Sequence, residues 1–219
     1  MGDFLQNLLS IQTLFTAIIF VISISLHEYA HAWMADRLGD PTPRNQGRLT
    51  PSPLSHIDPL GFILIFIIGF GWGRPVQYNP YYLKNPLWDE LKIALAGPAT
   101  NIVLSIIAII ILIVYSLFIG TAQDLVTTFW MQFAFLNIAL AVFNMIPLPP
   151  LDGYRIIKVF APGFTAKLEQ YSNYILIAFL LIFLRGPGSG LLQSYIVGVS
   201  SFIFHILYTI IAFPLQYLV

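Results

Sequence analysis

Five long apolar runs set the strongest limit on what this chain can fold into. They cover about residues 11–35, 93–120, 125–146, 171–184 and 195–217. A helix needs roughly 17 to 25 mainly apolar residues to cross a bilayer, and only the fourth run is shorter than that. Charged residues make up 9% of the chain, against about 25% in a soluble domain. The sequence therefore predicts an all-α polytopic membrane protein, with residues 1–219 as a single membrane-embedded domain.

A further apolar run, residues 61–73, contains four glycines and is too short to span. Three Lys or Arg residues precede it in its loop and three follow it, and these residues collect on the cytoplasmic side of membranes. A re-entrant segment or hairpin keeps both flanks in the cytoplasm, together with nine of the ten basic residues and the C-terminus. The alternative is a short sixth spanning helix, kinked by its glycines.

Charge and cysteine content exclude several classes of function. The net charge is zero and no basic block occurs, so nucleic-acid binding has no electrostatic support. The chain has no cysteine, which rules out disulfides and thiolate chemistry.

The first run contains HEYAH, residues 27–31, an unusual group of polar residues for an apolar helix. His27 and His31 are four residues apart, so both rings lie on one helix face and can bind one metal ion. Glu28 is close enough to act on a water beside that metal. This H-E-x-x-H arrangement supplies two zinc ligands and a general base. The alternative is a polar cluster that only joins helices by hydrogen bonds.

A catalytic zinc ion needs a third protein ligand. Asp124 is expected in an external loop, and His205 lies alone in the last run, where packing is its ordinary role. Asp152 lies in FNMIPLPPLDG, residues 143–153, where prolines break the third run on the same side as the histidines. A broken helix end at membrane depth is tolerated where it lines a cavity. Asp152 is thus the favoured ligand, although an Asp-Gly pair is also a common turn.

These motifs together resemble the site-2 protease family of intramembrane zinc metalloproteases (peptidase family M50). HEYAH matches its H-E-x-x-H, and NMIPLPPLDG at 144–153 matches its N-x-x-P-x-P-x-L-D-G. AGPATN at 96–101 is similar to the G-P-x-x-N of its middle core helix. The resemblance is to the compact subgroup of the family, whose members are expected to have no PDZ or CBS domain and to which GRLTPSPLSHIDPLG at 47–61 is also similar.

The resemblance implies a three-helix catalytic core at about residues 11–153, with additional C-terminal helices at about 171–217. It implies one Zn²⁺ held by His27, His31 and Asp152, with Glu28 as the general base. The implied substrates are transmembrane segments of other proteins, cleaved on the cytoplasmic side of a lipid bilayer. The membrane expected is the bacterial plasma membrane.

Four further residues are candidates for contacts with an unwound substrate: Asn101, Asn144, Pro147 and His56. Each has an ordinary structural alternative, such as helix packing for the two asparagines or an interfacial turn for His56. Two other functions are weighed against proteolysis. A metal transporter would need polar residues spaced along several helices, and a non-catalytic relative that binds transmembrane helices would be expected to have a broken ligand set.

Overall fold

The computed structural model describes residues 10–68, 71–119, 124–172, 174–175, 177–178, 181 and 189–215. Four of its helices are long and apolar enough to cross a membrane: α2 (Ile11–Arg37), α6 (Pro86–Phe118), α7 (Leu125–Asn144) and α11 (Ser189–Leu215). The shorter elements are α3 (Thr42–Asn45), α4 (Pro53–His56), α5 (Pro59–Ile68), η1 (Pro80–Tyr82), α8 (Asp152–Phe160) and α9 (Pro162–Glu169). The prediction of an all-α polytopic membrane protein is confirmed.

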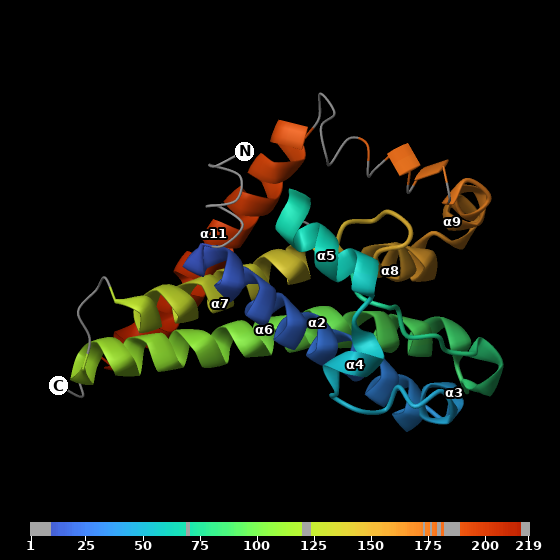
Figure 1. Ribbon diagram of the computed structural model, residues 1–219. Helices are drawn as coiled ribbons and strands as arrows, with labels where there is room; N and C mark the ends of the chain where they lie inside the picture. Colours follow the sequence, from blue (N-terminus) through green and yellow to red (C-terminus); the bar gives the residue numbers. More distant parts are fainter. Residues whose placement is uncertain are drawn as a thin grey trace.

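Helix α6 is the centre of the core, because it packs against both α2 and α7 (Figure 1). Ile19 of α2, Ile109 of α6 and Ala134 of α7 meet in one cluster and are fully buried. In lipid the hydrophobic effect does not drive helices together, so close van der Waals packing must hold this cluster. The expected three-helix core is therefore α2, α6 and α7.

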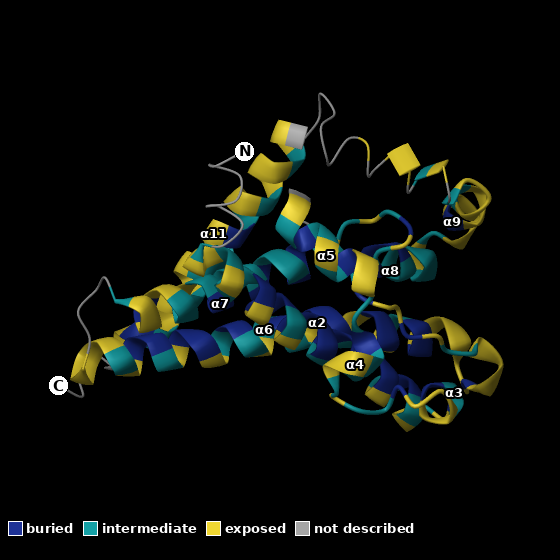
Figure 2. Cartoon of the chain, in the orientation of Figure 1, coloured by how far each residue is buried: buried dark blue, intermediate teal, exposed yellow. Residues whose placement is uncertain are grey.

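Helix α11 packs on α7 and α6 but remains mostly exposed (Figure 2). Only 6% of its apolar stretch is buried, compared with 44% for α2. Lipid must therefore cover most of its surface. Half of the fourth predicted run, 171–184, lies outside the described residues, and the single-domain assignment of the whole chain stays a prediction.

The short run at 61–73 is part of a hairpin, as one of the two sequence interpretations predicted. Its helix α5 has ten residues, too few to span. Ile57 and Gly73 form an antiparallel bridge, and Arg74 N–H donates to the His56 carbonyl at 2.7 Å. The two ends of the segment therefore lie side by side, and the alternative of a sixth spanning helix is wrong.

Candidate metal centre

Three predicted ligands converge at the buried junction of α2 and α8. His27 and His31 lie one turn apart on α2, and Asp152 is the first residue of α8. The Nε2 atoms of His27 and His31 are 3.0 Å apart. Oδ2 of Asp152 lies 3.2 Å from Nε2 of His27 and 3.3 Å from Nε2 of His31. Among the described residues, these three form a group of His, Cys, Asp or Glu side chains close enough to share a metal ion.

Helix α6 fixes the orientation of both imidazole rings. Nδ1 of His31 lies 2.7 Å from the Ile93 carbonyl, and Nδ1 of His27 lies 2.6 Å from Oδ1 of Asn101. A carbonyl oxygen only accepts, so each Nδ1 carries the proton and each neutral ring presents a lone pair at Nε2. When both rings are neutral, two such nitrogens and a carboxylate oxygen face one another with no proton between them, an arrangement that a cation stabilises.

The spacing of the three atoms fits zinc. Tetrahedral ligands at about 2.0–2.1 Å from zinc lie about 3.3–3.4 Å from one another, close to the separations of 3.0, 3.2 and 3.3 Å. Oδ2 of Asp152 is also buried without a hydrogen-bond partner, which is costly unless another group satisfies it. These residues therefore fit a zinc ion.

Gly97 of α6 leaves the space beside the two rings open. A Cβ atom added there would lie 2.5 Å from Nε2 of His27 and closer still to Nε2 of His31. Any other residue at this position would displace the candidate ligand atoms of the two rings. Gly97 belongs to the AGPATN motif, so the motif brings both a gap and a ring partner, Asn101, to the centre.

Asp152 reaches the histidines because the chain turns sharply after α7. Helix α7 ends at Asn144, and the following prolines cannot continue it. Gly153 permits the close return of the chain, since a Cβ there would lie 2.5 Å from the Ile146 carbonyl. Lys158 of α8 then pairs with Glu90 of α6 at 3.1 Å.

Glu28 is buried next to His27, and the segment that follows the hairpin contacts it. The Val76 backbone N–H donates to Oε2 of Glu28 at 2.9 Å. Tyr78 of the same segment packs its ring beneath the Arg155 guanidinium of α8, at 4.8 Å. One extended segment thus contacts both the candidate base and the helix that carries Asp152.

The four weaker candidates are placed differently from one another. Asn101 is fully buried and bonded to His27, which favours a positioning role over the substrate contact suggested by the sequence. His56 is also fully buried, and its Nε2 lies 2.6 Å from the Thr50 carbonyl. Asn144 is half-buried at the end of α7, where it donates to the Leu140 carbonyl, and Pro147 is exposed in the loop. Contacts with a substrate stay a prediction for the last two.

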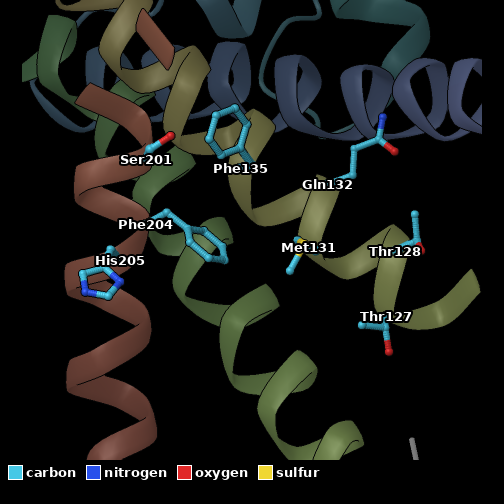
Figure 3. Close-up of a pocket in the computed structure, with 8 residues that line it drawn as sticks. All are labelled: Thr127, Thr128, Met131, Gln132, Phe135, Ser201, Phe204 and His205. Atoms are coloured by element: carbon cyan, nitrogen blue, oxygen red, sulfur yellow. The ribbon is translucent and has the colours of Figure 1, made fainter. Parts of the chain in front are cut away.

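His205 lies away from this centre, at a hollow of about 590 Å³ between α7 and α11 (Figure 3). Phe135 and Phe204 also line this hollow, and none of the three candidate ligands does. The expectation that His205 is not a ligand therefore agrees with its position.

Three contributors to the centre had no role in the sequence interpretation: Gly97, Val76 and Asn137. Gly97 was noticed only as part of a motif, and Val76 acts through its backbone, which leaves no signal in the sequence. Asn137 is fully buried within α7 and bonds to Asn101. An asparagine inside an apolar run was the available signal, because such residues mark helix contacts or functional sites.

Comparison with known proteins relates the chain to metal-dependent peptidases. The family described as peptidase family M50 matches residues 15–120 and 117–183. The Bacillus subtilis protein named "Putative zinc metalloprotease YwhC" is 39% identical over 197 residues, which are 86% of this chain and 88% of that protein. Rip2 of Mycobacterium tuberculosis, with the same descriptive name, is 27% identical over 84% of this chain and 71% of its own length. No solved structure gives a significant match.

Proposed function

The chain belongs to peptidase family M50 and is a zinc metalloprotease of the membrane, and from this premise we propose that it cleaves peptide bonds within or near transmembrane segments of other membrane proteins. One observation carries the proposal. Two imidazole lone pairs and an unpartnered carboxylate oxygen converge beside a buried glutamate. Such a set is suited to hydrolysis at a metal ion.

In this proposal His27, His31 and Asp152 hold the zinc ion, which when bound polarises the scissile carbonyl and a water molecule. The described residues would supply three ligands to this ion, which is the number found at catalytic zinc sites. Ile93 and Asn101 keep the two rings in the tautomer that binds metal.

Glu28 acts as the general base and then as the general acid. Its carboxylate accepts a proton from the attacking water and returns it to the leaving amine. The bond from Val76 N–H to Oε2 fixes the orientation of the side chain and leaves Oε1 to exchange the proton. Glu28 follows His27 directly in the chain, so the base stays next to the zinc ligands.

The position of the centre supports the proposed substrate class. His27 and His31 belong to a helix that is long and apolar enough to span a membrane. A transmembrane segment must unwind before a base can reach its peptide bonds, because its backbone groups are bonded within the helix. In this proposal Asn144 and Pro147, at the broken end of α7, contact such an unwound stretch. On the charge distribution of the loops, this end faces the cytoplasm.

Metal transport is not favoured, because the metal-binding side chains found in the described ranges form one cluster. A transport path needs polar groups along the full depth of the bilayer.

The deciding experiment compares the purified wild type with Glu28→Gln. Both are reconstituted in liposomes with a panel of single-span proteins tagged at both ends, and bound zinc is measured in parallel. We expect about one zinc per chain in both proteins, with cleavage lost only in Glu28→Gln. Asp36→Asn is the matched control, because Asp36 lies on the same helix but pairs with Arg44 at the surface. A Glu28→Gln protein as active as the wild type would refute the assignment of the base.

A further inference from the structure

The hydrogen bond that orients His27 belongs to a longer buried chain that ends on α7. Nδ2 of Asn101 donates to Oδ1 of Asn137 at 2.9 Å, and Nδ2 of Asn137 donates to the Phe133 carbonyl at 2.9 Å. Both asparagines are completely buried. This series of hydrogen bonds thus runs from the zinc site across α6 to the backbone of α7, and it links the three core helices.

The direction of every bond in this chain is fixed from its far end. The Phe133 carbonyl can only accept, so the amide nitrogen of Asn137 must face it. The amide oxygen of Asn137 then faces Asn101 and requires a donor, which is the amide nitrogen of Asn101. The oxygen of Asn101 is thereby left for Nδ1–H of His27, and Nε2 of His27 keeps its lone pair. A flipped amide at either position would set two donors or two acceptors against each other.

We propose that Asn137 is a positioning residue of the metal site, which acts through Asn101 to hold His27 in its zinc-binding tautomer. The inference rests on the proposed function, since it concerns the same three ligands. Two fully buried amides at membrane depth are a costly way to join helices that already pack well. Their cost is accounted for if this series of hydrogen bonds holds the zinc ligand His27 in one tautomer. Residues behind a metal ligand typically change metal affinity by about 10- to 100-fold.

The test measures zinc affinity without any substrate, by competition with a chromogenic chelator in detergent. The proteins are the wild type, Asn137→Leu, Asn101→Leu and the double variant. We expect Asn101→Leu to bind zinc about 10- to 100-fold more weakly, and Asn137→Leu about tenfold more weakly. The double variant should match Asn101→Leu, because Asn137 has no path to His27 once Asn101 is absent.

The matched control is Ser105→Ala, one turn from Asn101 on α6. Ser105 is equally buried and its hydroxyl has no hydrogen-bond partner. We expect Ser105→Ala to leave the zinc affinity unchanged. This would show that changing a buried polar side chain of α6 near Asn101 is not enough to weaken zinc binding. If Asn137→Leu does not fold, Asn137→Ala takes its place in the same cycle. Cobalt(II) loading adds a spectroscopic readout, since a changed His27 ligand should shift the visible bands in the Asn137 and Asn101 variants alike.

Two results would overturn the inference. One is wild-type zinc affinity in the folded Asn137 variant. The other is a double variant whose loss equals the product of the two single losses, because independent effects would mean that Asn137 acts only on packing. The proposed function fails in a different arm of the experiment, where the wild type itself would bind no zinc, and the inference would fall with it.

Discussion

Replacing Gly97 with alanine should weaken zinc binding strongly while leaving the fold intact. The added methyl would lie 2.5 Å from Nε2 of His27 and closer still to Nε2 of His31. Ordinary contacts of this kind are about 3.5 Å, so the rings must move by about 1 Å. Zinc ligands tolerate about 0.2 Å. We therefore expect zinc affinity to fall about 100-fold or more, which is about 2.7 kcal/mol.

The same substitution should not weaken the helix that carries it. Alanine is favoured over glycine in a helix interior by about 0.5–1 kcal/mol, and Gly97 lies inside α6. Gly97→Ala should therefore lower the zinc affinity without lowering the stability of the zinc-free protein. The first is measured by chelator competition, and the second by thermal unfolding followed by circular dichroism in the presence of a chelator.

Gly198→Ala provides the matched control. Gly198 is also inside a spanning helix, but a Cβ added there meets nothing within 4 Å. This variant gains the same helix preference and should bind zinc as the wild type does. Wild-type zinc affinity in Gly97→Ala would refute the geometry of the centre, because it would mean that α6 does not approach the two rings.

Three further predictions concern stability. Zinc at about 100 times its Kd should stabilise the wild type by about 2.7 kcal/mol, and Asp152→Asn should abolish most of this shift in thermal unfolding; an equal shift in both proteins would exclude Asp152 as a ligand. Lys158→Met leaves the buried Glu90 carboxylate unpaired and should cost about 1–3 kcal/mol in denaturant unfolding, whereas no loss would mean that the pair does not hold α8. Burial lowers the pKa of His56 below its ordinary 6.5. The contribution of neutral His56 to the free energy of unfolding is therefore complete above pH 6.5 and declines as the pH falls. His56→Gln should flatten this decline in melting curves from pH 5 to 8, and an unchanged curve would assign the decline to other groups.

The parts of the site that the sequence predicts are those set by local geometry. His27 and His31 share a helix face because helices repeat every 3.6 residues, and this holds wherever the helix packs. The break after Asn144 follows from the prolines, which cannot continue a helix. Asp152 was favoured because that break lies on the same side as the histidines, and the structure places its Oδ2 atom within 3.3 Å of both rings.

The remaining parts depend on which surfaces of the helices meet, and no local pattern specifies that. Asn101 was a candidate for contact with substrate, with helix packing as the alternative. Its amide instead faces His27, since α6 crosses α2 at that level. Asn137 could be noticed as a polar residue in an apolar run, but not connected to a metal ligand more than a hundred residues away in the chain. The structure supplies that connection through Asn101.

The hairpin and the orientation of the general base are consequences of one topology. Val76 reaches Glu28 only because the chain returns through the Ile57–Gly73 bridge to the side from which it departed. If residues 61–73 crossed the bilayer, Val76 would emerge on the opposite face, about 30 Å from where it started. Glu28 would then lose its backbone donor, and Tyr78 could not stack on Arg155 of the helix that begins with Asp152. In the sequence, equal numbers of basic residues on both sides of residues 61–73 indicated a segment that returns to the same face. They therefore also indicate that the segment after the hairpin can contact the metal centre.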